Sequence, residues 1–174
     1  MADLDSFEDI YDEHVSMVFN LCLNYVQQRE EAEEITQDVF LKVYQKFNGF
    51  NQRAQLKTWI YRISINACLD HLKAKKRKKR SIFFSQTEED LPEVQDMDHP
   101  GVLLENQEAL KELFKHIESL PEKQRSVLIL KAIEGLSQKE IADILKTSEK
   151  AVESLFSRAK ENLRQTRKDS EGKR

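Results

Sequence analysis

The sequence LSQKEIADILKTSEKAVESLFSRAKENL, residues 136–163, contains two short helical periods joined by one tight break. Ser137 precedes the first period and Glu140 follows three residues later, which is the spacing of a capping box at a helix start. The first period stops at residues 146–148, Lys-Thr-Ser, where a hydroxyl side chain can cap a second helix. The stretch therefore predicts a helix-turn-helix.

The second helix of this pair has an apolar and a polar side. Apolar residues recur from Val152 to Leu163 every three or four positions, as on a helix that packs on its neighbour. The opposite side carries short polar and charged side chains, which can read a DNA major groove. The residues predicted to do so are Lys150, Glu153, Ser154, Ser157 and Arg158. An ordinary helical hairpin would show the same apolar spacing, so the rest of the chain must distinguish the two.

The composition favours helices throughout. Only four glycines and three prolines occur among 174 residues, and Leu, Lys, Glu, Gln and Ala are abundant. The 39% of hydrophobic residues suffices for compact cores of modest size. We therefore expect an all-α fold made of two small helical domains.

Charge is segregated along the chain, although the net charge is only −3. Residues 1–50 carry three basic and 11 acidic side chains, whereas residues 51–80 carry ten basic and one acidic. Residues 81–110 hold eight acidic side chains and no basic one. Alternating blocks of this size indicate that different surfaces meet different partners.

Residues 81–102 break the helical patterns. They contain two of the three prolines and a glycine but no lysine or arginine, so we predict a flexible acidic linker. The linker separates a first domain, residues 1–80, from a second, residues 103–168. Residues 169–174 should form a disordered tail.

Two helices of the first domain offer candidate binding faces. A helix from about Glu30 to Phe47 leaves Gln37, Asp38 and Leu41 at the rim of its apolar stripe, either as plain solvent-exposed residues or as a docking face for another protein.

A helix from Gln55 to about Lys79 is apolar on two sides, and its remaining strip leads into the basic run KAKKRKKR. Trp59 and the preceding Phe50 could stack on an unpaired base, although a core tryptophan and a solvated basic run would give the same pattern. The polar residues of the strip are Thr58, Arg62, Asn66, Lys73 and Arg77.

The sequence does not favour a disulfide, a metal site or a membrane span. Cys22 and Cys68 lie among apolar neighbours, as two buried thiols in a reducing compartment would. Cys68 and His71 are three residues apart, but no second close pair completes a metal site. No apolar stretch is long enough to span a bilayer, and the N-terminus is acidic, so we expect a cytoplasmic protein without membrane insertion.

No catalytic constellation is visible either. The sequence has no glycine-rich phosphate loop and no nucleophile with a suitably spaced histidine. We therefore expect no enzyme, no cofactor and no small-molecule substrate.

Three ordered stretches resemble the two domains of the extracytoplasmic function (ECF) sigma factors of bacterial RNA polymerase. They are EEAEEITQDVFLKVYQKF (30–47), LKTWIYRISINACLDHLKAKKRKKR (56–80) and SLPEKQRSVLILKAIEGLSQKEIADILKTSEKAVESLFSRAKENLR (119–164). The resemblance implies a protein that binds core polymerase, directs promoter-specific initiation and is held inactive by an anti-sigma factor.

The resemblance also assigns roles to residues of the first domain. Gln37, Asp38 and Leu41 correspond to the docking surface for polymerase. The residues implied in recognising and melting the minus-ten element of promoter DNA are Phe50, Asn51, Arg53, Thr58, Trp59, Arg62, Asn66, Lys73 and Arg77.

In the second domain, the polar side of the second helix corresponds to the reader of the minus-thirty-five element. Glu153 and Leu155 stand where many members carry a basic residue, so fewer phosphate contacts are expected, and Glu153 can accept from a cytosine amine. Lys146 stands where glycine is common. Either this lysine is left-handed, at a cost of roughly 1 kcal/mol, or the turn differs.

Two alternatives use the same features differently. A dimeric helix-turn-helix regulator would bind duplex DNA unaided, and an RNA-binding protein would depend on the basic run instead of Arg158.

Overall fold

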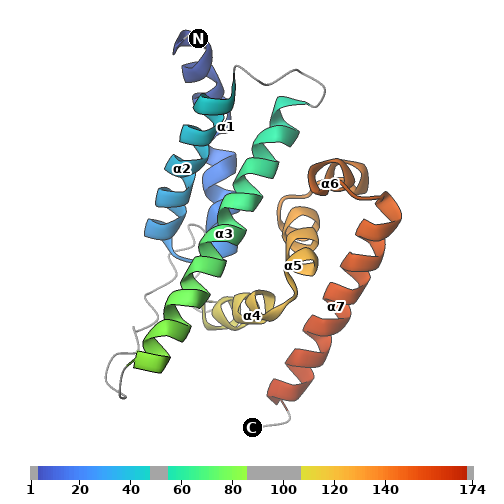
Figure 1. The fold of residues 1–174 in the computed structure, drawn as a ribbon. Helices are drawn as coiled ribbons and strands as arrows, with labels where there is room; N and C mark the ends of the chain where they lie inside the picture. Colours follow the sequence, from blue (N-terminus) through green and yellow to red (C-terminus); the bar gives the residue numbers. More distant parts are fainter. Residues whose placement is uncertain (1–3, 48–54, 86–106, 172–174) are drawn as a thin grey trace. The chain divides into compact units, whose positions relative to one another are not determined.

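The structure, a computed structural model, describes residues 4–47, 55–85 and 107–171 (Figure 1). All regular structure within these ranges is helical, which confirms the predicted all-α class. The helices are α1 (Leu4–Val26), α2 (Arg29–Phe47), α3 (Leu56–Ser85), α4 (Gln107–Ser119), α5 (Glu122–Leu128), the π-helical turn η2 (Ile129–Ile133), α6 (Gln138–Leu145) and α7 (Glu149–Glu171).

The helices form two compact units, as expected from the sequence. One unit contains α1, α2 and α3 from Ile63 onward, and the other contains α4 to α7 together with the first turns of α3.

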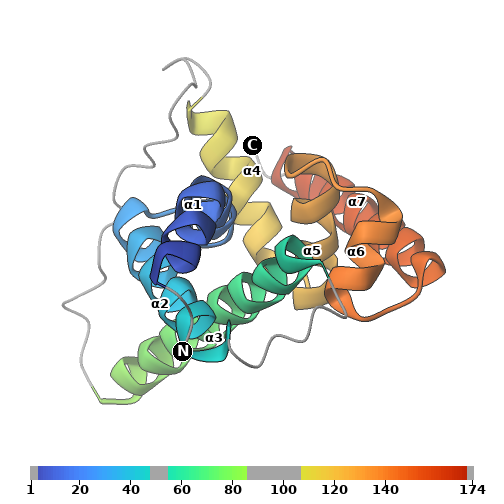
Figure 2. The same ribbon diagram turned by 90° about the horizontal axis from the view of Figure 1, so that it is seen from above.

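In the first unit, α1 and α2 form a hairpin and lie side by side (Figures 1 and 2). The chain leaves α1 at Gln27, whose φ of 60° is left-handed and whose N–H donates to the Leu23 carbonyl at 2.9 Å. The hairpin core consists of residues that are at most 2% exposed. They include Val18, Leu21, Ile35, Val39 and Val43.

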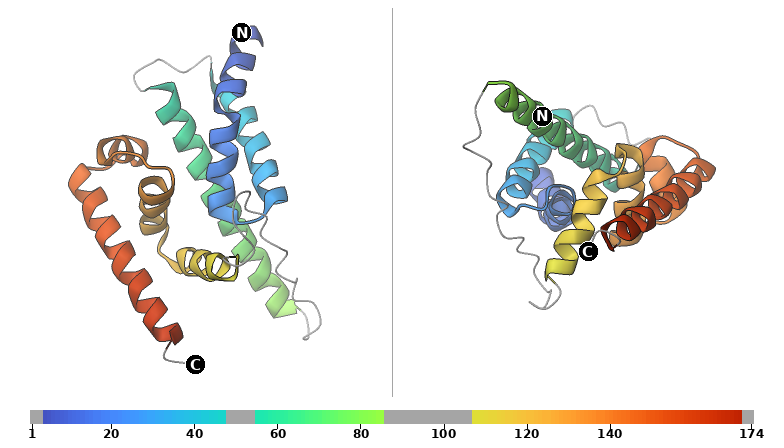
Figure 3. Two further views of the ribbon diagram at one scale, coloured as in Figure 1. Left: turned by 180° about the vertical axis from the view of Figure 1, so that it is seen from behind. Right: turned by 90° about the horizontal axis from the view of Figure 1, so that it is seen from below.

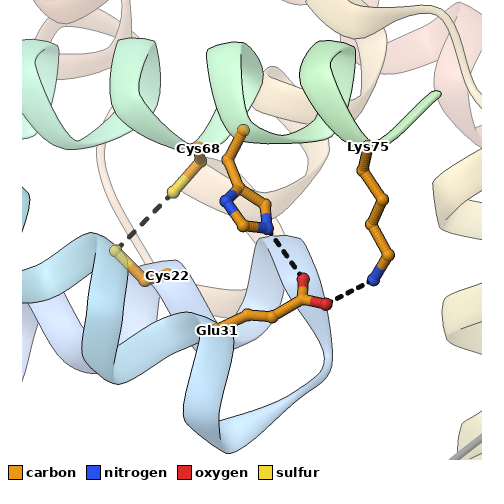
Figure 4. Close-up of polar contacts among 5 residues, drawn as sticks. Cys22, Glu31, Cys68 and Lys75 are labelled. Atoms are coloured by element: carbon orange, nitrogen blue, oxygen red, sulfur yellow. Dashed lines mark hydrogen bonds and ion pairs between the residues drawn. The ribbon is translucent and has the colours of Figure 1, made fainter. Parts of the chain in front are cut away.

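A half-buried carboxylate ties α2 to α3 (Figure 4). The Glu31 side chain is only 19% exposed, and its two oxygens accept from His71 Nε2 at 2.9 Å and from Lys75 Nζ at 2.5 Å. Because a carboxylate can only accept, the His71 ring carries its proton on Nε2. Glu31 therefore holds the start of α2 against the helix that carries the basic run.

In the second unit, α7 packs along α5 and α6 (Figure 3). Val127, Leu130, Ile141 and Val152 are fully buried in its core. The buried Arg125 guanidinium donates to the carbonyls of Glu118 and Leu120 at the end of α4. An arginine thus satisfies carbonyls that the end of α4 leaves without a helical partner.

The end of α5 departs from a regular α-helix. Its last turn is a π turn, η2, in which the Glu134 N–H donates to the Ile129 carbonyl at 3.0 Å. Gly135 then takes a φ of 69°, a left-handed conformation that glycine adopts at little cost.

Two helices extend beyond their predicted ends. α3 continues to Ser85 and α7 to Glu171, so residues 81–85 of the predicted linker and 169–171 of the predicted tail are helical. Neither extension contains a proline or a glycine, the residues that most strongly end a helix.

Replacing Glu31 with Gln should lower the free energy of unfolding by about 1–2 kcal/mol, because it removes two charge-assisted hydrogen bonds from a partly buried site. Urea denaturation measures the change. Glu33→Gln is the matched control, since Glu33 is about half exposed and pairs with the nearby Arg29 of its own helix. Its loss should cost less than about 0.5 kcal/mol. Equal costs for the two variants would show that Glu31 does not clamp the helices.

Candidate nucleic-acid interface

The helix-turn-helix begins at a closed capping box. Ser137 Oγ accepts from the Glu140 N–H at 3.2 Å, while Glu140 Oε2 accepts from the Ser137 N–H at 2.8 Å and from its hydroxyl at 2.6 Å. The bond from the Ser137 hydroxyl, followed by that from its N–H, lowers the pKa of Glu140. The carboxylate is therefore ionised at neutral pH, and the predicted start of α6 is confirmed.

The turn after α6 is built on a left-handed lysine. Lys146 has φ 52° and ψ 51°, and its N–H donates to the Ala142 carbonyl. The Thr147 N–H donates to the same carbonyl at 3.0 Å. Of the two possibilities expected from the sequence, the strained lysine is correct. Its strain costs roughly 1 kcal/mol, since Cβ crowds the backbone in this conformation.

Two contacts set the direction of α7 relative to α6. The Ser148 hydroxyl accepts from the Ala151 N–H at 3.2 Å and so caps α7. The Gln138 amide donates to the Glu149 carbonyl at 2.8 Å and links the first turns of the two helices. The sequence left Thr147 and Ser148 as alternative caps, and Ser148 provides the cap hydrogen bond.

The two sides of α7 differ as the sequence predicts. Val152 and Ala159 are fully buried, and Leu155, Phe156 and Leu163 are half-buried. The five residues predicted to read the minus-thirty-five element are all exposed, at helical spacings that bring them together on the outer side. They are Lys150, Glu153, Ser154, Ser157 and Arg158.

Arg158 is held along the surface of its own helix. Its Nη2 donates to Ser154 Oγ at 2.7 Å, and its Nε lies 3.4 Å from the Ser154 carbonyl oxygen. An exposed contact between residues four apart is worth only about 0.2–0.5 kcal/mol. The guanidinium can therefore exchange this contact for the edge of a guanine at little cost.

The predicted minus-ten residues that lie within the described ranges follow one side of α3. Their spacing at 3.6 residues per turn places them within one face. Asn66, Lys73 and Arg77 are exposed, whereas Thr58, Trp59 and Arg62 are half-buried. Phe50, Asn51 and Arg53 fall outside the described residues.

The end of α3 adds a basic stripe that the site prediction included only in part. Lys73, Lys76, Arg77 and Arg80 follow each other at i, i+3, i+4 and i+7, and all four are exposed. They cover about 10 Å of helix at 1.5 Å per residue. A cationic stripe of this kind suits a polyanionic backbone.

A different kind of surface lies on α2. Gln37, Asp38 and Leu41 are exposed, and Leu41 is 56% exposed. Tyr44, three residues further on, is 40% exposed and meets the Phe7 ring of α1 edge-on at a centroid distance of 5.1 Å. Leu41 is therefore part of a small apolar patch beside a carboxylate, a surface typical of protein contacts.

Within the described ranges, no group of three or more His, Cys, Asp or Glu side chains is arranged to hold a metal ion. No helix there is both long enough and apolar enough to cross a membrane.

Comparison with known proteins identifies relatives of the whole chain. Residues 10–78 match the family model of sigma-70 region 2, and residues 110–163 match that of sigma-70 region 4. The chain is 32% identical to the ECF RNA polymerase sigma factor SigW of Bacillus subtilis, over 97% of this chain and 92% of that relative. It is 29% identical to the ECF RNA polymerase sigma-E factor of Escherichia coli K12, over 93% and 86%.

Two solved structures share the fold. One is CnrH in complex with the cytosolic domain of CnrY, with a TM-score of 0.66 and 19% identity over 97% of this chain and 91% of that one. The other is the sigma factor RpoE in complex with the anti-sigma factor NepR from Bartonella quintana, with a TM-score of 0.68 and 20% identity over 94% and 97%.

Replacing Lys146 with Gly should raise the free energy of unfolding by about 0.5–1 kcal/mol, because glycine takes the left-handed turn without strain. Chemical denaturation measures the gain. Lys139→Gly, inside α6, is the control and should instead lose about 1 kcal/mol. If both substitutions lowered the free energy of unfolding, the backbone of Lys146 would not be strained.

Proposed function

Because this chain belongs to the family of ECF sigma factors, we propose that it binds core RNA polymerase through α2 and reads two promoter elements through α3 and α7. Residues 1–80 serve the polymerase and the minus-ten element, and residues 103–168 serve the minus-thirty-five element. The observation that carries the proposal is the outer side of α7, where all five predicted reading residues are exposed on a helix whose other side is buried.

The DNA contacts divide into two kinds. On α7, Arg158 can donate two hydrogen bonds to a guanine, and Glu153 can accept from a cytosine amine, so this helix specifies sequence. The stripe that begins at Lys73 faces phosphates and supplies affinity without sequence preference. Trp59 and Asn66 engage an unpaired strand, where stacking offsets the few kcal/mol that opening a base pair costs.

Contact with the polymerase uses Gln37, Asp38 and Leu41. The exposed leucine supplies apolar area and Asp38 supplies charge complementarity, which favours the correct partner. The function is one of binding, in the cytoplasm, with the chemistry left to the polymerase. An anti-sigma factor, such as the one bound to the RpoE relative, would keep the protein inactive by covering these faces.

The experiment that tests this function is transcription in vitro with core polymerase, the purified protein and a library of random upstream DNA. Sequencing the transcript starts should reveal protein-dependent starts that share two upstream elements. If initiation never depends on the protein, and the protein alone shifts a palindromic duplex, it is a dimeric regulator. If nucleic-acid binding survives the loss of Arg158 but requires the basic run, the protein is an RNA-binding protein.

Replacing Asp38 with Arg should weaken binding to core polymerase at least tenfold and leave the melting temperature unchanged, because it reverses a charge on an exposed docking face. Fluorescence anisotropy of labelled protein measures the affinity. Glu33→Arg makes the same charge change on the same helix, about 140° away around its axis, and should have little effect. Equal loss in both variants would point to net charge instead of a docking face.

Replacing Arg158 with Ala should relax the preference at one base pair of the minus-thirty-five element by about 1–3 kcal/mol, seen in the sequences recovered from the transcription library. Lys160→Ala is the control. Lys160 lies two residues further along α7, about 160° from Arg158 around the helix axis, and its Nζ is 4.9 Å from the centroid of the Phe156 ring. An unaltered base preference in Arg158→Ala would remove this arginine from the readout.

A further inference from the structure

We propose that Cys22 and Cys68 form an oxidation site, at which a hydroperoxide converts the two thiols into a disulfide that joins α1 to α3. The two sulfur atoms lie 3.6 Å apart, and both side chains are fully buried (Figure 4). Both residues belong to the same compact unit. The inference goes beyond the proposed function and does not depend on it.

The geometry requires only a small movement. The Cys68 thiol donates a hydrogen bond to Cys22 Sγ, so the two side chains already point toward each other. A disulfide bond is about 2.05 Å long, and the sulfur atoms must therefore approach by about 1.5 Å. The chain has no other cysteine, so an intramolecular disulfide can form only between these two.

The surroundings of the pair slow the reaction of its thiols with bulky oxidants. The hydrogen bond with Cys22, followed by burial, raises the pKa of Cys68 well above its usual value. Since the thiolate is the reactive form, exchange with bulky disulfides is slow. A small hydroperoxide that enters during local opening can still react, and a small dithiol can reach and reduce the product by the same route.

The reaction balances without any group from the protein beyond the two thiols. One of the two thiols, deprotonated during local opening, attacks one peroxide oxygen, the O–O bond breaks, and a sulfenic acid forms as hydroxide leaves. The other thiol then attacks the sulfenic sulfur, the S–O bond breaks, and water is released. Overall, two thiols lose two hydrogen atoms and hydrogen peroxide is reduced to two molecules of water.

The disulfide would stabilise the folded state of the first unit. It closes a loop between residues 46 positions apart, which restricts the unfolded chain and so favours the folded one. His71 and Lys75, one and two turns after Cys68, already hold Glu31 of α2. Oxidation would thus fasten α3 to both helices of the hairpin.

The test treats the purified full chain with hydrogen peroxide, unfolds it in guanidinium with excess alkylating agent, and measures the intact mass. We expect a monomer about 2 Da lighter that takes up no alkylating agent. We also expect its melting temperature to rise by at least about 5 °C and to return after treatment with dithiothreitol.

Cys22→Ala and Cys68→Ala are the controls, and peroxide should neither remove two hydrogen atoms from them nor raise their melting temperatures. The proposal would be overturned if both thiols still took up the alkylating agent after peroxide treatment. It would also be overturned if sulfinic acids or disulfide-linked dimers formed instead of the intramolecular disulfide. A rise in melting temperature that persists in either variant would do so as well. The mass of the wild-type protein decides the matter even if the variants fold poorly.

Discussion

Burial of one side of α7 is the constraint on which the reading face depends. Val152 and Ala159 are completely buried within the unit in which α7 packs on α5 and α6, so the helix cannot rotate without exposing them. The residues between them on the other side must then face outward, where the proposed contact with DNA needs them. The capping box of α6, the left-handed Lys146 and the bond from Gln138 to α7 fix the remaining freedom of the turn.

The same division between packing and binding recurs in the first unit. α2 buries Ile35, Val39 and Val43 and leaves Leu41 with its polar neighbours outside. Glu31 adds an electrostatic tie to α3, because it pairs with Lys75 of the basic run and with His71. Each binding face is thus the side of a helix that its own core does not use, and core and interface can vary separately.

The periodicity of apolar residues predicted most of the helices, because each helix depends on interactions among residues that are close in the sequence. Ser137 with Glu140, and the two sides of α7, follow from spacing alone. The bond from Glu31 to His71 joins residues 40 apart, and the contact between Cys22 and Cys68 joins residues 46 apart, so no local pattern could reveal them. The π turn at Ile129–Ile133 also escaped prediction, because its apolar residues fit an α-helix equally well. The binding roles assigned to all the site residues remain predictions, and Phe50, Asn51 and Arg53 lie outside the described residues.

If both units read one promoter, as we propose, the polymerase must hold them at a fixed distance. The most direct test is transcription from a promoter selected by this protein, with five base pairs inserted between its two elements, which rotates one element by about half a helical turn. We expect initiation to be lost and to return when the original spacing is restored. Initiation that is indifferent to the insertion would mean that only one unit reads DNA, and would contradict it.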